Sequence, residues 1–370
     1  MSAPRTLPRR VLMTADAVGG IWHYALQLAR GLTESDVKVV LTVLGPPPAP
    51  EQRAAAAAID GLTLVHGDFT LEWLPGAEGE LDAAGTWLLE LEEVLDPDLV
   101  HLNGFAHAAL PWRVPTVVVA HSCVLSWWRA VKGAEAPAEW VDYRRRTRAG
   151  LRAADLVVAP TRAFLEEVQA LYGPLDRTRW IWNGCAPAQP PDGAKEPLIF
   201  AAGRVWDQAK NLHALAAVSH RLAWPVAIAG PGAPGHAPSA AAPWLGSLPP
   251  EAMRGWYARA SVFALPSRYE PFGLAALEAA MAGCALVLGD IPTLREIWDG
   301  AALFVPPDDR EEWVSALNTL AEDPELLWLL GGLARSRAEG YSAARMTARY
   351  LDAYAGLLAA PPRAVAALAS

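Results

Sequence analysis

Short apolar runs alternate with amphipathic segments along most of the chain. The first apolar run, residues 11–14, is followed by a turn at Gly19 and Gly20, and residues 21–32 then repeat apolar side chains at helical spacing. The same order of strand and helix recurs through the first half. The strands expected there are 11–14, 37–44, 62–66, 99–102, 116–120 and 156–159, and the helices are 21–32, 86–95, 138–153 and one that Thr161 caps.

The hydrophobic pattern is interrupted at residues 183–197, which are rich in Gly and Pro and show no periodicity. Beyond this segment the alternation begins again. Two alternating halves on either side of a Pro-rich segment predict two domains joined by a linker. The strands expected in the second half are 198–201, 226–229, 262–265, 285–288 and 302–305, with helices near 211–222, 250–260, 273–282 and 310–321.

Strands that alternate with helices are typical of parallel sheets in α/β units. The sequence therefore predicts two doubly wound, Rossmann-like domains that face each other across a deep cleft, where a ligand would bind. The expected boundaries are 1–185 for the first domain, 186–197 for the linker and 198–340 for the second domain. The remaining segment, 341–370, is expected to form a helix that packs back on the first domain.

The charge balance bears on whether the protein binds nucleic acid. The chain has 31 Lys and Arg residues against 40 Asp and Glu residues, and its net charge of -9 argues against a nucleic-acid-binding protein. Its one dense cationic run allows two interpretations, which are a solvated helix face and a contact with an anionic membrane surface or an acceptor phosphate. This run consists of Arg144, Arg145, Arg146 and Arg148.

The cysteines and the apolar runs bear on the cellular location. Cys123, Cys185 and Cys284 lie far apart and form neither a metal-ligand pattern nor a disulfide framework, so we expect a reducing compartment. No apolar run reaches the length of a signal sequence core or a transmembrane helix. We therefore expect a cytoplasmic protein whose membrane contact, if any, is peripheral.

Residues 266–278 are the most informative segment for chemistry. An expected strand ends before Pro266, and a helix is expected to begin near Phe272 and Gly273. The backbone N–H groups at such a helix start are unpaired, and together with the helix dipole they favour an anion. Glu270 lies just before this helix and Glu278 lies inside it, so both can face one ligand at different depths. Taken singly, each carboxylate could equally be an ordinary helix residue.

Glu270-Pro-Phe-Gly-Leu-Ala-Ala-Leu-Glu278 resembles the E-x7-E motif of the family 4 retaining glycosyltransferases, which have the GT-B fold and are also known as glycosyl transferases group 1. The resemblance covers the C-terminal half nearly throughout and the N-terminal half more loosely. It extends to the family's G-R-…-K element, here Gly203, Arg204 and Lys210, and to its nucleotide-side turn at Gly230. Asn183 corresponds to the start of the linker, and residues 286–296 correspond to the strand and loop after the motif.

The resemblance implies transfer of a hexosyl group from a nucleotide-diphosphate sugar to a hydroxyl acceptor, with an α-linked product. Arg204 and Lys210 would bind the donor diphosphate, although Lys210 stands six residues after Arg204 where the family commonly has five. Glu270 would bind hydroxyls of the transferred sugar, and Glu278 would accept hydrogen bonds from the ribose. The nucleotide side would also include Gly230 and the amides of Phe272, Gly273 and Leu274.

The first domain would bind the acceptor, which is a saccharide, a lipid-linked molecule or a small molecule. Gly19 and Gly20 resemble the loop that closes against the donor phosphates, where Asp16 would contact a sugar hydroxyl. His121 follows an expected strand and corresponds to a histidine near the anomeric carbon. For the remaining candidates, a structural role and contact with the acceptor are both open: His101, Asn103, and the tryptophans Trp127 and Trp128 in an expected loop.

The resemblance also implies front-face attack, in which the departing phosphate takes the acceptor proton and no separate base is needed. Asp96-Pro97-Asp98 matches a metal-binding D-x-D element, but it precedes an expected strand, away from the ligand edge. We therefore expect no metal and no cofactor besides the sugar nucleotide. Two alternative functions are a nucleotide-sugar epimerase on the same fold and an inactive protein that binds sugar nucleotides.

Overall fold

The computed structural model describes residues 6–186, 194–232 and 242–360. The chain divides into two compact units. Unit 1 contains residues 1–126, 135–182 and 343–370, and unit 2 contains residues 127–134 and 183–342. Most of the expected linker, residues 187–193, lies outside the described residues. Within the described ranges, no helix is both long enough and apolar enough to cross a membrane.

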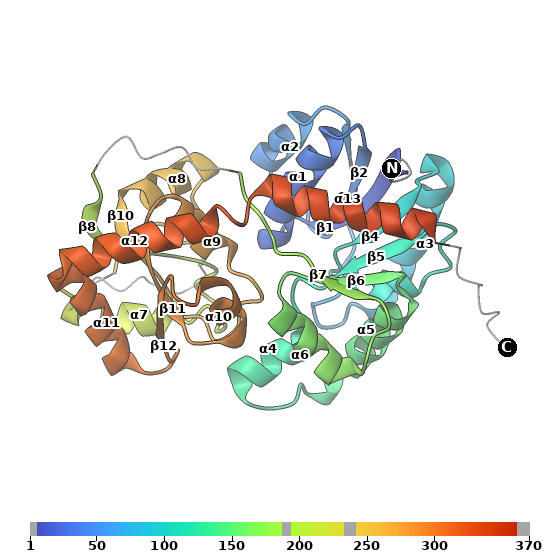
Figure 1. Cartoon of the computed structure of the whole chain (residues 1–370). Coiled ribbons are helices and arrows are strands. Elements are labelled where there is room, and N and C mark those ends of the chain that lie inside the picture. Colours follow the sequence, from blue (N-terminus) through green and yellow to red (C-terminus); the bar gives the residue numbers. More distant parts are fainter. Residues whose placement is uncertain (1–5, 187–193, 233–241, 361–370) are drawn as a thin grey trace. The chain divides into compact units, whose positions relative to one another are not determined.

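Unit 1 is built on a seven-stranded parallel sheet with the strand order β3-β2-β1-β4-β5-β6-β7 (Figure 1). Its central strands are almost entirely buried, because a parallel sheet is covered on both faces and selects continuous apolar runs. The strands are β1 Arg10–Asp16, β2 Lys38–Leu44, β3 Leu62–Gly67, β4 Leu99–Leu102, β5 Thr116–Val119, β6 Leu156–Ala159 and β7 Thr178–Trp180.

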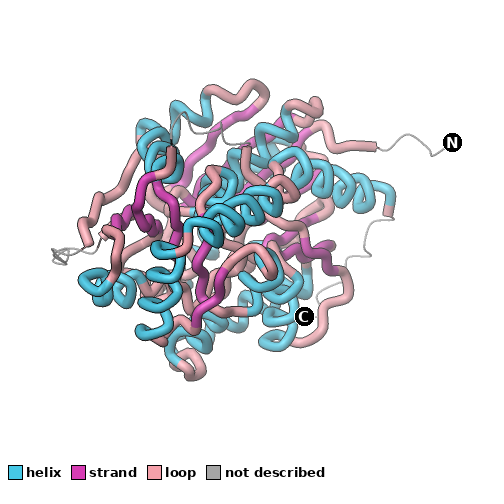
Figure 2. The backbone as a smooth tube through the Cα atoms, turned by 60° about the vertical axis from the view of Figure 1, so that its left-hand side comes forward, coloured by secondary structure: helices cyan, strands magenta, loops and turns pink. Residues whose placement is uncertain are grey.

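Helices flank this sheet (Figure 2), and the last helix of the chain, α13, packs beside the first, α1 (Figure 1). Leu28 of α1 and Tyr350 of α13 belong to the same buried cluster, so residues from both ends of the chain share one core. The elements are α1 Gly20–Thr33, α2 Pro50–Ala57, α3 Glu78–Leu95, η1 Ala106–Ala109, α4 Val124–Lys132, η2 Ala138–Trp140, α5 Val141–Ala153, α6 Arg162–Tyr172 and α13 Ala343–Ala359, and α4 continues into unit 2.

Unit 2 contains a five-stranded parallel sheet with the order β12-β11-β10-β8-β9. Trp313 and Leu317 lie in its buried core with the strand residues Val262 and Val287. The elements are β8 Glu196–Ala202, α7 Leu212–Val218, η3 Ser219–Arg221, β9 Val226–Ala229, α8 Pro250–Arg259, β10 Ala260–Leu265, α9 Leu274–Met281, β11 Ala285–Gly289, α10 Pro292–Trp298, β12 Leu303–Val305, α11 Arg310–Glu322 and α12 Pro324–Ala338.

Each sheet contains one place where the direction of strand addition reverses. In unit 1 it lies between β1 and β4, and in unit 2 between β8 and β10. Loops that leave neighbouring strands at such a point turn to opposite faces of the sheet, which opens a crevice at the carboxyl ends. Asn103 follows β4, Arg204 follows β8 and Glu270 follows β10, so the expected site residues lie at these two reversals.

The sequence placed Trp127 and Trp128 in a loop, and this prediction was wrong. Both residues lie in α4, whose side chains Leu125 and Ser126 are buried and whose last turn carries Arg129 and Lys132. Basic residues at a helix C-terminus interact favourably with the helix dipole, and this signal was overlooked. Strand β7 and the helices α2, α10 and α12 were also not expected from the hydrophobic pattern.

Two glycines in helices of unit 1 allow a test of this packing. A Cβ atom on Gly150 of α5 would lie 1.8 Å from the carbonyl oxygen of Phe105, whereas one on Gly356 of α13 would have no heavy atom within 4 Å. Gly150→Ala should therefore lower the free energy of unfolding by about 2 kcal/mol or more, and Gly356→Ala should raise it by up to about 1 kcal/mol. Urea unfolding measures both changes. Equal effects of the two substitutions would contradict the close contact between α5 and η1.

Candidate functional site

Lys210 and Glu270 form an ion pair at the strand reversal of unit 2. The Lys210 Nζ lies 2.5 Å from Glu270 Oε2, and the two side chains are only 18% and 13% exposed. The other carboxylate oxygen, Oε1, accepts a hydrogen bond from the Gly273 N–H at 3.1 Å. The Thr293 hydroxyl donates to the Glu270 carbonyl oxygen at 2.6 Å. Glu270 is thus held at the start of α9 by contacts on its side chain and on its backbone.

Arg204, at the end of β8, is held by an aspartate that the sequence analysis did not identify. Its Nη2 donates to Asp207 Oδ2 at 2.6 Å. Burial alone would raise the pKa of Asp207, but the Arg204 charge and the Ala209 N–H outweigh it and lower that pKa. In the part of the chain that the structure describes, the buried Nε of Arg204 has no hydrogen-bond partner. Arg204 therefore keeps an unused donor, a common feature of groups that bind a ligand.

The segment after Arg204 determines where Lys210 lies. The Lys210 N–H donates to the Asp207 carbonyl oxygen at 3.0 Å, which closes a turn. Asn211 then adopts a left-handed conformation with a φ of 53°, and its Nδ2 donates to the Pro307 carbonyl oxygen at 2.7 Å. Although Lys210 stands six residues after Arg204, this turn places the Lys210 ammonium beside Glu270.

Gly230, which follows β9, is required by the close approach of two backbones. Its φ is 136°, and a Cβ there would lie 1.8 Å from the Gly203 carbonyl oxygen. Its N–H donates to the Gly246 carbonyl oxygen at 2.8 Å, and its own carbonyl accepts from Trp244 Nε1 at 2.7 Å. Only glycine fits this position without displacing the loop that carries Arg204.

The remaining candidates in unit 2 lie around α9. Gly273 has a φ of 90° and precedes Leu274, the first residue of the helix. Phe272 is buried, and its ring makes an edge contact with Tyr341. Glu278 lies within α9, where burial raises the pKa of its carboxyl, while the Tyr257 hydroxyl and the Arg254 charge act in the opposite direction.

The two tryptophans of α4 were expected to contact an acceptor. Trp127 Nε1 donates to Asp207 Oδ1 at 3.2 Å. The ring of Trp128 makes an edge contact with that of Trp127, and the Lys132 ammonium lies 6.0 Å from the Trp128 ring. Trp127 is therefore hydrogen-bonded within the protein, a contact that was not predicted from the sequence.

In unit 1, a chain of hydrogen bonds connects the candidates at the ends of β4 and β5. His121 Nε2 lies 2.8 Å and His101 Nε2 lies 3.1 Å from the same oxygen, Asn103 Oδ1. The Asn103 amide nitrogen donates to the Thr14 carbonyl oxygen at 2.7 Å. On its other side, His101 Nδ1 lies 2.6 Å from the hydroxyl of Tyr354, which belongs to α13. Asn103 is therefore the centre of this network.

The network indicates which ring nitrogen of each histidine carries the hydrogen. The Thr14 carbonyl can only accept, so the Asn103 amide must turn its oxygen toward the rings, and each His Nε2 must carry the hydrogen. Burial lowers the pKa of His101 to about 4. Burial and the neighbouring His101 lower the pKa of His121 to about 3. Both rings are consequently neutral at pH 7.

Of this network, Thr14, Asn103 and His121 lie on a cavity of unit 1 with about 750 Å³ of empty space, part of it open to solvent. Asp16 lies on it at the end of β1, and Asp16 Oδ1 accepts a hydrogen bond from the Val18 N–H at 2.8 Å. Gly19 follows with a φ of 120°, and Gly20 begins α1. The residues that line the cavity include Thr14, Asp16, Ile21, Leu44, Thr70, Leu71, Glu72, Trp73, Leu102, Asn103, Phe105, His121, Ser122 and Tyr143.

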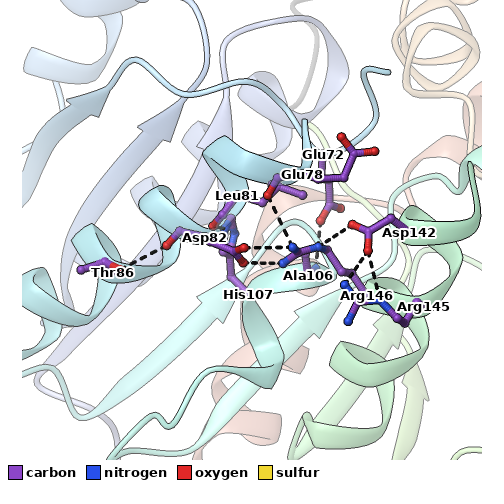
Figure 3. Close-up of polar contacts among 10 residues, drawn as sticks. All are labelled: Glu72, Glu78, Leu81, Asp82, Thr86, Ala106, His107, Asp142, Arg145 and Arg146. Carbon is purple, nitrogen blue, oxygen red and sulfur yellow. Dashed lines mark hydrogen bonds and ion pairs between the residues drawn. The ribbon is translucent and has the colours of Figure 1, made fainter. Parts of the chain in front are cut away.

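Glu72 is a second carboxylate on this cavity that the sequence analysis missed. Its oxygens accept hydrogen bonds of 2.9 to 3.0 Å from the Phe105 N–H and one of 2.9 Å from the Ala106 N–H, where η1 begins. Figure 3 shows the contact with Ala106. Burial raises the pKa of Glu72, and these N–H donors offset part of that effect. An acidic residue within the apolar run Leu71-Glu72-Trp73-Leu74 was the available signal.

The cationic run lies on α5 and is largely paired with carboxylates. Arg146 reaches Asp82 and Asp142 at 2.6 Å each (Figure 3). Arg144 pairs with Glu135 at 3.0 Å. Asp98, of the D-x-D element, accepts from the N–H groups of Arg9 and Arg10, at the amino end of β1. Among the described residues, no group of three or more His, Cys, Asp or Glu side chains could hold a metal ion.

Two family models match most of the chain. Residues 18–189 match the family model described as Glycosyltransferase Family 4, and residues 196–323 match the model described as Glycosyl transferases group 1. The chain is 28% identical over 347 residues to α-maltose-1-phosphate synthase of Mycolicibacterium smegmatis, which covers 80% of this chain and 87% of that protein.

Solved structures resemble the whole fold. Sucrose-phosphate synthase of Thermosynechococcus elongatus matches with a TM-score of 0.78 at 18% identity, over 95% of this chain and 100% of that chain. HepE of Anabaena, solved with UDP and glucose, matches with a TM-score of 0.76 at 14% identity, over 94% of this chain and 100% of that chain. The expected GT-B fold, with two α/β domains built on parallel sheets, is confirmed.

Acid should destabilise unit 1 through the two neutral histidines. Below pH about 6.5 the unfolded chain binds protons that the folded chain excludes, so stability falls as the pH approaches the folded values of about 4 and about 3. His121→Gln should make this slope shallower by up to about 1.4 kcal/mol per pH unit. Urea unfolding at a series of pH values measures the slope. The exposed His66→Gln is the control, and an unchanged slope in His121→Gln would refute the exclusion of a proton from this ring.

Proposed function

Because the chain belongs to the family 4, group 1 glycosyltransferases, which transfer a sugar from a nucleotide sugar, we propose that it is a retaining hexosyltransferase. The donor is a nucleotide-diphosphate sugar, the acceptor is a hydroxyl group, and the product is α-linked. The observation that carries this proposal is the convergence of Arg204, Lys210 and Glu270 at the strand reversal of unit 2.

The donor diphosphate would bind to Arg204 and Lys210. The buried Nε of Arg204, which has no partner among the described residues, offers a donor to a phosphate oxygen, and Nη2 is already oriented by Asp207. Lys210 is now neutralised by Glu270. A phosphate that replaces Glu270 as the partner of Lys210 would release a carboxylate oxygen for a hydroxyl of the sugar. Binding of the donor and positioning of the sugar are thereby coupled through one ion pair.

The remaining donor contacts follow from the geometry of α9 and of the loop before α1. The amides of Phe272, Gly273 and Leu274 lie at a helix start, where anionic oxygens are favoured, and a donor oxygen would share the Gly273 N–H with Glu270 or replace Glu270 there. Glu278, further along α9, would accept hydrogen bonds from the ribose. Gly230 would leave room for the nucleotide, and Gly19 and Gly20 at the start of α1 in unit 1 would approach the diphosphate.

Transfer would proceed by attack of the acceptor hydroxyl from the face that the nucleotide leaves, with the departing phosphate accepting the proton. His121 supports this mechanism because a ring with a pKa of about 3 is a poor proton acceptor at neutral pH. Its role would be to orient the sugar. The protein therefore supplies positioning and stabilisation of the leaving diphosphate.

We further propose that the reaction needs no metal ion and that the enzyme is cytoplasmic. The aspartates of the D-x-D element lie at the amino ends of β1 and β4, whereas ligands of such sheets bind at the carboxyl ends. The positive charges of Arg204 and Lys210 would take the place of a metal at the diphosphate. The epimerase and the inactive binding protein are not favoured by the relatives of this chain.

Removal of the charged donor contacts should abolish turnover without unfolding the protein. Arg204→Ala and Glu270→Ala should each lower kcat at least about a hundredfold, because each removes a contact to the leaving group or to the sugar. Arg221→Ala is a matched control, since Arg221 is similarly exposed but pairs with Glu311 on the surface of unit 2. Release of nucleotide is measured with each donor, and circular dichroism checks the fold. Full activity of either site variant would overturn the assignment.

The stereochemistry and the metal requirement are tested on the same reaction. The first product formed should carry the α configuration, which proton NMR of the anomeric signal identifies before any equilibration. Activity should be unchanged after treatment with EDTA, because Arg204 and Lys210 supply the positive charge. A β-linked product would exclude retention from an α-linked donor. Loss of activity that added magnesium or manganese restores would contradict metal independence.

A further inference from the structure

We infer that the acceptor bound in the unit 1 cavity is an uncharged, polyhydroxylated molecule and carries no phosphate there. This inference rests on the proposed function and specifies its acceptor. It is drawn from the cavity at the carboxyl ends of β1, β4 and β5, which Asp16, Asn103 and His121 line.

The cavity has no cationic side chain to hold a phosphate. None of the described residues that line it is Lys or Arg, whereas Asp16 and Glu72 are carboxylates. His121 is neutral and lines the cavity as a polar but uncharged ring. Proteins usually bind phosphate with Arg or Lys side chains, and carboxylates in an enclosed space repel an anion.

Backbone N–H groups could replace a cation, but the carboxylates of the protein already use several of them. Glu72 accepts from the N–H groups of Phe105 and Ala106 where η1 begins. Asp16 accepts from the Val18 N–H in the loop before α1. At these points an incoming phosphate would have to displace an anion of the protein. The first N–H groups of α1 are assigned to the donor diphosphate under the proposed function.

Arg146 does not change this balance. It lines a small neighbouring cavity together with Glu72, but it is not among the residues that line the larger one. Its Nε binds Asp142 at 2.6 Å, and its Nη1 binds Asp82 at 2.6 Å. A phosphate would therefore compete with two carboxylates for this guanidinium.

The same lining suits hydroxyl groups. Carboxylate oxygens of Asp16 and Glu72 can accept hydrogen bonds from a polyol, and the hydroxyls of Ser122 and Tyr143 can donate or accept. The Thr70 hydroxyl donates to Glu80 and can still accept. Apolar surface for the faces of a sugar ring is supplied by Leu44, Leu71, Trp73 and Val124. A few convergent polar groups on an apolar wall are typical of a site for a small neutral ligand.

The experiment uses the full chain and matched acceptor pairs. A thermal-shift panel of nucleotide sugars first identifies the donor, and nucleotide release is then measured with glucose and glucose 1-phosphate, and with myo-inositol and inositol 3-phosphate. The uncharged member of each pair should have a kcat/KM at least about tenfold higher, because like charges brought together typically cost several kcal/mol and 1.4 kcal/mol corresponds to tenfold. Equal or better use of the phosphorylated members would overturn the inference, and so would failure of every uncharged acceptor at saturating concentration.

A variant separates the charge from other roles of the cavity. In Asp16→Asn the amide oxygen can still accept from the Val18 N–H, but one negative charge is lost. The preference for uncharged acceptors should fall by about tenfold in this variant. The matched control Asp68→Asn removes a charge from an exposed residue of the same unit outside the cavity lining and should leave the preference unchanged. An unchanged preference in Asp16→Asn would count against the electrostatic origin.

The proposed function has its own readout. Binding of the nucleotide sugar, and its slow hydrolysis without acceptor, should require Arg204 whichever acceptor is used. Loss of that requirement would refute the proposed function. If the requirement holds and the phosphorylated acceptors are preferred, only the inference about the acceptor fails.

Discussion

The site residues of this protein depend on a constraint of parallel sheets, which is that all strands of a sheet end at the same edge. Where the strand order reverses, neighbouring loops diverge and leave space between them. The reversals at β1 and β4 and at β8 and β10 create that space in the two units. Polar side chains that follow neighbouring strands are then brought together although they are separated in sequence, as Asn103 and His121, or Lys210 and Glu270, show.

In both units, carboxylates of the protein pair with the cations or accept hydrogen bonds from the N–H groups that could otherwise hold an anion. Glu270 pairs with Lys210, Asp207 orients Arg204, and Glu72 accepts from the N–H groups where η1 begins. In unit 2 these carboxylates stand beside cationic side chains, for which the proposed diphosphate would compete. In unit 1 the carboxylates bind backbone amides with no cation on the cavity, so the balance favours neutral ligands.

The sequence predicted most strands because buried parallel strands are continuous apolar runs, and β4 and β6 have the bounds expected. It also predicted the capping of α6, where Thr161 Oγ1 accepts from the Phe164 N–H. The hydrogen-bond network of Asn103 could not be predicted, because Tyr354 lies 253 residues from His101 along the chain. Asp207 and Glu72 were missed since the role of a lone carboxylate depends on which N–H groups the fold places beside it. Helix α4 was missed although its buried Leu125 and the basic residues Arg129 and Lys132 of its last turn are signals of a helix.

The hydrogen bond between Tyr354 and His101 has a consequence for biosynthesis. Unit 1 is discontinuous, since its sheet is made early in translation while α13 is made after all of unit 2. Until α13 leaves the ribosome, the His101 Nδ1 has no hydroxyl to bind, and the core residues of α1 that face α13 stay uncovered. The unit whose sheet is made first is thus completed only after unit 2 has been made, and α13 determines when the hydrogen bonds of His101 are complete.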